Sequence, residues 1–175
     1  FSIPISAQNS LFFATPATLN TTSQDGLVDL SKVTVAYKFN ATNQSWDQIV
    51  AGTTVAPTEA VFVRSTASHS VALIVNAAQT SPSARSLPSG WNLVGLAALL
   101  SATAMPVDQA LISVYSTPAG LVGYTQVVTP AVNSVQFAWT RGQQGGPPNL
   151  ARWLGYWVYM ENGDTLAGFS STPIQ

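Results

Sequence analysis

The chain lacks cysteine, has a single histidine and carries few charged side chains. Its 175 residues include six Lys or Arg and seven Asp or Glu, so 7% are charged, against about 25% in an average globular protein. Without cysteine there is no disulfide framework, and one histidine is too few for a histidine- or cysteine-based zinc site. The net charge of −1 and the lack of a basic patch exclude nucleic acid as a partner.

Long apolar runs are also missing. No stretch approaches the ~20 apolar residues of a membrane-spanning helix, so the sequence predicts no membrane span. The high net charge of many disordered chains is absent too. The chain begins at Phe1 with no initiator Met, basic n-region or apolar signal segment, and we therefore expect it to be a mature or excised segment.

Hydroxyl, amide and small side chains take the place of charges, since Ser, Thr, Ala, Val and Gln are frequent. A surface of this kind repels its own copies weakly, because few like charges face each other. The composition therefore predicts an extracellular, secreted protein that forms a homo-oligomer or polymer. An ordinary secreted domain with a low charge count is the alternative.

Strand-forming patterns dominate the chain and predict a mainly β, β-rich α+β fold. A β-branched and aromatic run at 33–39, a polar turn at 40–45 and a second run at 46–50 predict one hairpin. A second hairpin is expected around residues 65–69. Further strands are expected at Trp91–Leu96 and Tyr156–Met160.

One turn and one helix have specific signals. Glu161–Asp164 contains Asn-Gly, which accepts a positive φ at low cost and therefore predicts a tight turn. A short helix is expected near 106–115, because Pro106 suits a first turn. Four apolar residues fall on one face of this helix, at i, i+3, i+4 and i+7: Val107, Ala110, Leu111 and Val114.

The sequence divides at a small, polar stretch with two prolines, which predicts a linker over residues 77–89. The flanking modules, 1–76 and 90–175, align as two copies of one repeat. Ala60–Ile74 lies over Gly155–Phe169 without a gap, each with a strand, a turn and a strand. Two unrelated hairpins would give the same match.

The second module carries Gly-Trp-Asn-Leu at its start, a Pro-Val-Asp-Gln-Ala-Leu helix start and Gly-Tyr-Trp-Val-Tyr-Met near its end. Over Gly90–Phe169 this pattern resembles a tandem repeat of secreted and cell-surface, surface-layer-type proteins of bacteria and archaea, in which GWNL opens each copy and GYW closes it. The first copy departs from the pattern, since Pro57–Arg64 replaces the GYW stretch. The resemblance implies an extracellular, modular structural protein without assigned catalysis, and it supplies no active-site residues.

The first copy would have its opening motif before Phe1, which leaves a sheet position short of residues. An unfilled edge exposes N–H and C=O groups that another chain can pair with. We therefore expect strand addition at Phe1, Ile3 and Ile5 between subunits of a surface layer or filament. A proteolytic boundary is the alternative.

Aromatic residues near the C-terminal end are candidates for carbohydrate binding. Strand alternation puts Trp157 and Tyr159 on one face, and an exposed face would stack on sugar rings. Trp139 and Trp153 would extend such a platform. This second function, an adhesion module with a polysaccharide partner, requires two or three coplanar exposed rings beside amides. Core packing is the alternative for each ring.

Catalytic and metal-binding patterns are incomplete. His69 is not accompanied by a G-x-S-x-G elbow, so we expect no catalytic triad. Asp25 and Asp29 would offer oxygens to calcium, but the D-x-D-x-D-G spacing is missing. We expect no cofactor and no enzyme, with a glycosidase as a remote alternative that would need two converging carboxylates.

Three N-x-S/T triplets are candidate glycan acceptors in an extracellular protein, at Asn20, Asn40 and Asn43. Chance supplies such triplets easily in a chain rich in Ser and Thr, so the motif by itself is unspecific.

Overall fold

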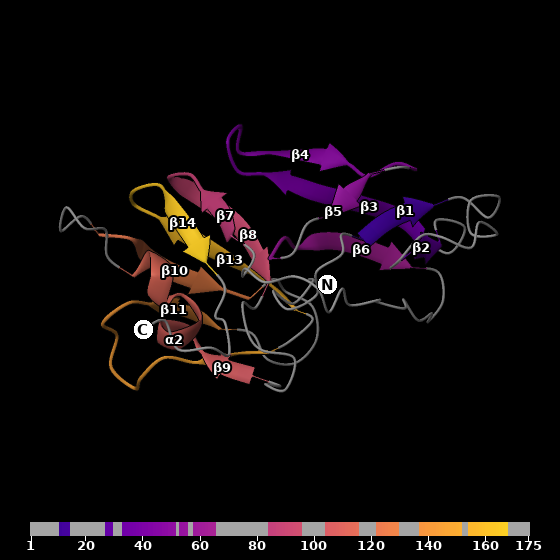
Figure 1. The fold of residues 1–175 in the computed structure, drawn as a ribbon. Coiled ribbons are helices and arrows are strands. Elements are labelled where there is room, and N and C mark those ends of the chain that lie inside the picture. Colours follow the sequence, from indigo (N-terminus) through magenta and orange to yellow (C-terminus); the bar gives the residue numbers. More distant parts are fainter. Residues whose placement is uncertain are drawn as a thin grey trace, which may run out of the picture.

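The computed structural model describes residues 11–14, 27–29, 33–51, 53–55, 58–65, 84–95, 104–115, 122–129, 137–151 and 154–167. Within these residues short strands form small sheets (Figure 1), which confirms the predicted mainly β fold. The strands of the first half are β1 (Leu11–Ala14), β2 (Leu27–Asp29), β3 (Val33–Asn40), β4 (Ser45–Gln48), β5 (Thr54–Val55) and β6 (Val61–Ser65). Those of the second half are β7 (Ala84–Leu87), β8 (Gly90–Gly95), β9 (Ala104–Pro106), β10 (Tyr124–Val128), β11 (Ala138–Thr140), β12 (Asn149–Ala151), β13 (Gly155–Met160) and β14 (Asp164–Ala167).

Strand β3 is the centre of the sheet β4-β3-β6 in the first half. The predicted hairpin forms from β3 and β4, joined by a turn at 41–44. Phe39 pairs with Trp46 across this hairpin, and Tyr37 pairs with Phe62 on β6. Because side chains alternate along a strand, these four rings share one face of the sheet. A second sheet of this half has the order β2-β1-β5.

The second half is built on the sheet β11-β10-β13-β8 and on a bent antiparallel ribbon. The β13–β8 pair continues, past a corner, as the β14–β7 pair. At the corner three residues, 161–163, lie opposite two, Pro88 and Ser89. The β13–β14 side of the ribbon is therefore one residue longer there than the β7–β8 side. The prediction of a tight turn at Glu161–Asp164 is wrong: residues 161 and 162 form a bend, neither Asn162 nor Gly163 has a positive φ, and the strands on either side pair with β8 and β7 instead of with each other.

Residues 84–87 of the expected linker are strand β7, so the prediction of a linker is wrong for these four residues. Leu87 is fully buried in the core of the second half and lies opposite Asp164 on β14. The residues around Leu87 are small or polar, so the sequence gives little sign of a strand. Within β7 the buried residue is Leu87. Residues 77–83 lie outside the described part.

The helical segment of the second half is shorter than expected. A single α-helical turn, α2 (Val107–Ala110), is followed by a 3₁₀ turn, η2 (Ile112–Val114). All four residues of the predicted apolar face are nevertheless buried, at 1% exposure or less. In the part of the chain that the structure describes, no helix has the length and apolarity needed to cross a membrane.

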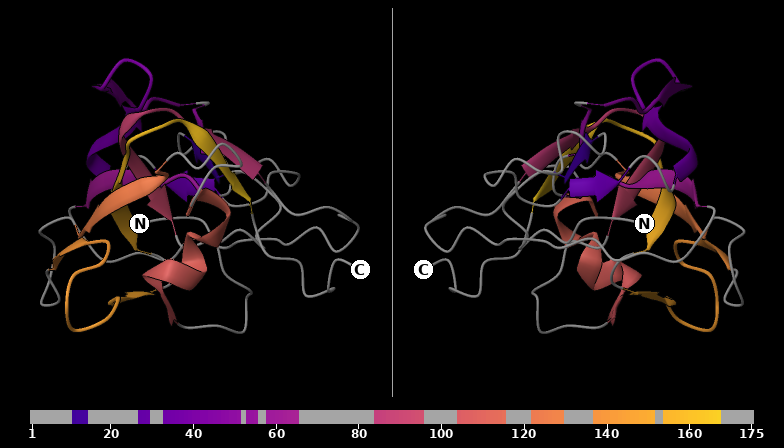
Figure 2. Two further views of the ribbon diagram at one scale, coloured as in Figure 1. Left: turned by 90° about the vertical axis from the view of Figure 1, so that its left-hand side faces the viewer. Right: turned by 90° about the vertical axis from the view of Figure 1, so that its right-hand side faces the viewer.

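The four-stranded sheet lies between two layers. One face, with Tyr156, Val158 and Met160 of β13, packs in the main core against α2 and η2. The other face carries Trp157 and belongs to a second buried cluster shared with the first half. Figures 1 and 2 accordingly show the β3–β4 hairpin above β8 and β13, with α2 below them.

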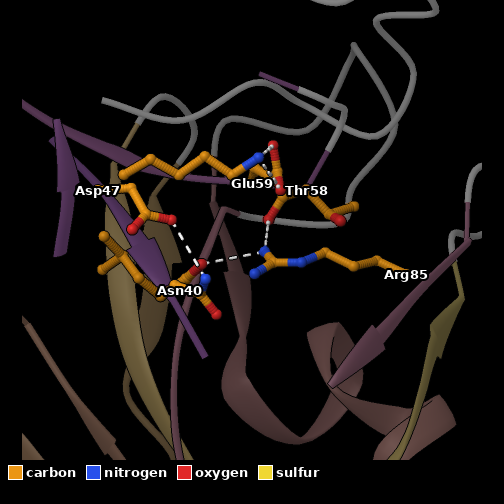
Figure 3. Close-up of polar contacts among 7 residues, drawn as sticks. Asn40, Asp47, Thr58, Glu59 and Arg85 are labelled. Atoms are coloured by element: carbon orange, nitrogen blue, oxygen red, sulfur yellow. Dashed lines mark hydrogen bonds and ion pairs between the residues drawn. The ribbon is translucent and has the colours of Figure 1, made fainter. Parts of the chain in front are cut away.

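Polar contacts also join the two halves (Figure 3). The Arg85 guanidinium on β7 donates to the carbonyls of Thr58 and Leu93, both at 3.0 Å. Burial lowers the pKa of Arg85, and the nearby Glu59 carboxylate opposes that shift. Glu59 also pairs with Lys38 of β3 at 2.7 Å. A partly buried cation therefore bonds backbone from both halves at one point.

Replacing this cation will loosen the contact between the halves. We expect Arg85→Met to lower the free energy of unfolding by about 1–3 kcal/mol, because the apolar stem is kept while charge-assisted bonds to two carbonyls are lost. The exposed Arg64 is the matched control, and Arg64→Met should stay within about 0.5 kcal/mol of the parent. Urea unfolding measures both, and equal effects of the two variants would contradict the role of Arg85.

Two buried tyrosines of the main core should respond differently to loss of the hydroxyl. Tyr156 Oη accepts from the Ala151 N–H at 2.6 Å, whereas Tyr124 Oη is buried without a hydrogen-bond partner among the described groups. We expect Tyr156→Phe to cost about 1–2 kcal/mol and Tyr124→Phe to be neutral or stabilising at neutral pH, as thermal unfolding will show.

Alkaline pH provides a further test of Tyr124. Burial raises its pKa to about 12, Asp108 and Tyr115 add to the shift, and Arg141 opposes it. Below its ordinary pKa of 10.0 the hydroxyl is protonated in both states and stability does not depend on it. Above that value the unfolded chain ionises first, so unfolding becomes easier up to about pH 12. Tyr124→Phe should flatten this decline in a urea titration, and an unchanged slope would contradict the assignment.

Candidate functional site

A continuous row of aromatic rings crosses the boundary between the two halves. We call it the aromatic seam, and its members are Phe39, Trp46, Trp91, Trp157 and Tyr159. Ring centroids lie 4.7 Å apart for Phe39–Trp157, 5.3 Å for Phe39–Trp46, 5.6 Å for Trp46–Trp157, 5.2 Å for Trp91–Tyr159 and 6.3 Å for Trp91–Trp157. All five contacts are edge-to-face, a favourable geometry for aromatic pairs.

Strand register explains how the seam forms. Trp91 lies opposite Tyr159 in the β13–β8 pair, and Phe39 lies opposite Trp46 in the β3–β4 hairpin. Alternation then puts Trp157 on the same face as Tyr159, as the sequence predicts. The two aromatic faces meet at Phe39, which is 9% exposed.

The seam opens to solvent at its first-half end. Trp46 and Phe62 are 47% and 45% exposed, and with Tyr37 they line a cavity of about 480 Å³. We call this cavity the aromatic hollow. The Tyr37 and Trp46 rings meet at 69°, so the walls form a slot in place of a flat platform.

Two polar residues lie on the same sheet face as the aromatic hollow, outside its described lining. Gln48 lies opposite Tyr37 on the edge strand β4, and Arg64 follows two residues after Phe62 on β6. By alternation both share the face of the hollow, and both are exposed. The acidic neighbour Asp47 falls on the other face, where its carboxylate accepts from Asn40 Nδ2 at 3.2 Å. The described lining of the hollow is therefore aromatic, and Gln48 and Arg64 share its sheet face.

These rings do not form the coplanar strip that sugar stacking was expected to need. Among the described rings of the seam and hollow, the contacts have interplanar angles from 69° to 86°. Trp157 and Tyr159 are only partly accessible, since both pack against Trp91. The arrangement suits an apolar group inserted between rings.

The expectation that Trp139 extends an exposed aromatic platform is wrong. Trp139 pairs with Val127, and Val127 pairs with Val158, so all three side chains face the main core. Trp139 is only 8% exposed and packs in that core. It therefore lies on the opposite side of the sheet from Trp157.

Several predicted site residues lie outside the described part of the chain: Phe1, Ile3, Ile5, Asn20, Asp25, His69 and Trp153. Asp29 ends strand β2, where only the backbone is described. No group of three or more His, Cys, Asp or Glu side chains that could hold a metal ion occurs within the described ranges.

The two glycan candidates that the structure describes differ in their surroundings. Both polar atoms of the Asn40 side chain are hydrogen-bonded: Nδ2 donates to Asp47, and Oδ1 accepts from the Asn43 N–H at 3.2 Å. Asn43 is exposed in the β3–β4 turn. Asn43 is therefore the more accessible of the two.

Comparisons of the chain with protein-family models, with curated proteins and with solved structures found no match. The resemblance of Gly90–Phe169 to a surface-protein repeat therefore remains a prediction from the motifs quoted above.

The three residues of the hollow, Tyr37, Trp46 and Phe62, were not among the sequence candidates, and neither were Phe39 and Trp91 of the seam. Tyr37 and Trp46 carried a usable signal, because the expected hairpin, with its turn at 40–45, sets Trp46 opposite Phe39. Phe62 had none, because its strand was expected in a hairpin around residues 65–69, whereas β6 pairs with β3.

The loss of unfolding free energy in two tryptophan variants will distinguish a ring of the hollow from a ring of the core. We expect Trp139→Ala to cost about 3–5 kcal/mol of unfolding free energy, as for other large buried rings. Trp46→Ala should cost about 1–2 kcal/mol, since half of its surface is already in water and only its edge-to-face contacts are lost. Chemical denaturation measures both, and an equal or larger loss at Trp46 would show that this ring is a core residue.

Proposed function

We propose that this chain is an extracellular structural protein whose subunits associate with one another, as in a surface layer or filament. The observation that carries the proposal is the aromatic hollow: two large aromatic side chains, each nearly half exposed, border a cavity on a protein with very few charges. Exposed apolar patches mark surfaces that bind other molecules, and low charge permits close approach of identical copies.

The edge strand β4 supports the same proposal. Ile49 N–H donates to Ala36 C=O at 2.9 Å, which sets the alternation of the ladder and directs the backbone groups of Trp46 and Gln48 away from β3. In the sheet that the structure describes, β4 pairs with β3 alone. Since Phe1, Ile3 and Ile5 lie outside the described residues, we propose this edge as a further place for β-strand addition between subunits.

Carbohydrate binding has weaker support. Its favourable feature is the exposed Trp46 beside the Gln48 amide, but the rings of the hollow form a slot, whereas stacking on a sugar ring needs a flat surface. Catalysis draws no support from the seam or the hollow, because the described residues that form them are aromatic.

Sedimentation velocity over a range of protein concentrations tests the proposal. We expect concentration-dependent oligomers that persist at high salt, because apolar contacts are not screened, and that increase with sulfate. The double variant Trp46→Ser/Phe62→Ser should weaken association at least tenfold.

The control is Ile112→Ser, which removes an apolar side chain of 56% exposure on η2 and should leave association unchanged. A parent protein that stays monomeric at millimolar concentration, or association that the double variant does not alter, would contradict the proposal.

A further inference from the structure

Backbone groups along the outer side of β8, an edge strand of the four-stranded sheet, are already hydrogen-bonded. The Gln44 side-chain amide donates to the Trp91 C=O at 2.9 Å and accepts from the Trp91 N–H at 3.1 Å. Two residues further along, the Leu93 C=O accepts from Arg85 at 3.0 Å. The β3–β4 turn and β7 therefore occupy this edge, and it offers little to another strand.

The outer side of β4 is different. The N–H and C=O groups of Trp46 and Gln48 point away from β3, and within the described residues none of these four groups has a hydrogen-bond partner. Figure 1 shows β4 on the outer side of its hairpin, away from β8 and β13. Unpaired donors and acceptors in a row are a template for a further strand.

A second copy of β4 fits this template. In an antiparallel ladder with a twofold axis at Asp47, Trp46 of each copy lies opposite Gln48 of the other. Residues in such a pair exchange both of their N–H···O=C bonds. All the outward groups of Trp46 and Gln48 in both copies then gain a partner, and no other segment of the chain is needed.

The neighbouring registers pair fewer groups. With the axis at Trp46, Gln48 would face Gln44, whose φ of 50° takes it out of the extended conformation. With the axis at Gln48, Trp46 would face Val50. The Val50 N–H already donates to Thr53 Oγ1 at 3.1 Å. The first register is therefore the one that the strand favours.

This register covers Trp46 but brings two carboxylates together. Gln48 of the second copy lies directly opposite Trp46, and the two Trp46 rings are diagonal neighbours within reach of each other. The two Asp47 side chains face each other across the axis, where like charges oppose pairing. Lys38 lies opposite Asp47 within each copy, but its ammonium already pairs with Glu59 at 2.7 Å. Each copy thus brings one unbalanced negative charge to the axis.

We propose that two copies join through antiparallel pairing of their β4 strands about Asp47, and that the Asp47 carboxylates keep this pairing weak. The inference rests on the proposed self-association and names the strand, the register and the residue that limits it. A twofold contact closes on two copies, so a layer or filament needs a second contact. Phe62 lies on β6, beyond β3, and stays exposed for that purpose.

A single introduced cysteine tests the register, because the chain has none of its own. In Asp47→Cys the two Cα atoms would lie about 4.5 Å apart across the axis, a separation that a disulfide spans. We expect mild oxidation to give a covalent dimer at concentrations where the parent associates. The matched control is Asn43→Cys, exposed in the turn of the same hairpin but away from the axis. Gel electrophoresis without reductant should show its dimer forming about tenfold more slowly or not at all.

Three further variants separate backbone pairing from charge. Gln48→Pro removes an outward N–H that the β3 ladder does not use. It should weaken association about tenfold or more, whereas Gln48→Thr keeps the N–H and should stay within about twofold of the parent. Asp47→Asn keeps an acceptor for Asn40 and should strengthen association at low salt, with a smaller gain at high salt. Sedimentation velocity measures the three, and circular dichroism checks that they fold.

The outcomes distinguish the two proposals. If the parent associates but Asp47→Cys forms its disulfide no faster than Asn43→Cys, another surface or a different strand makes the contact. The inference is then wrong, although the proposed function stands. Association of Gln48→Pro at the strength of the parent leads to the same conclusion. An Asp47→Asn variant that associates no more strongly overturns the role of the carboxylate. If the parent itself does not associate, both proposals fail.

Discussion

The edge-to-face contact between Phe39 and Trp157, with centroids 4.7 Å apart, is the interaction on which the rest of the structure depends. It joins a strand of the first half to a strand of the second half. Aromatic side chains bury about 150–250 Å² each, so a few such rings hold together two sheets that are individually small. Once Phe39 is buried, its cross-strand partner Trp46 must lie at the margin of the contact, half in solvent. The hollow is a consequence of how the halves meet.

The low charge of the chain and its alternating strands together determine what lies at the boundary between the two halves. Each face of the β8–β13 pair is apolar, one toward α2 and one toward the first half. Where charge does enter the boundary, it is paired: Arg85 bonds two carbonyls and Glu59 contacts Lys38. A chain with this arrangement has little charge left on its surface to keep copies apart, and this physical property links the fold to the proposed assembly.

Local patterns in the sequence predicted what local interactions decide. The apolar face from Val107 to Val114 and the β3–β4 hairpin both depend on residues close in sequence, and the structure contains them. The turn predicted after Met160 is absent, because β13 and β14 each pair with a strand from elsewhere in the chain. The side of the sheet that Trp139 faces depends on pairing with β10, and strand β7 depends on pairing with β14, far away in the chain. Alternation alone does not say which face of a strand lies in the core. From the sequence, the pairing of Trp46 with Phe39 could therefore be predicted, but the hollow could not.

The most direct test of the account follows the tryptophan indoles by NMR while copies of the protein associate. A protein whose tryptophan indoles carry ¹⁵N is observed as its concentration is raised through the range where oligomers form. If the hollow lies at the contact between copies, the indole N–H signal of half-exposed Trp46 will shift or broaden, while that of Trp139 in the core keeps its position. An unchanged Trp46 signal at concentrations where oligomers form would contradict the account.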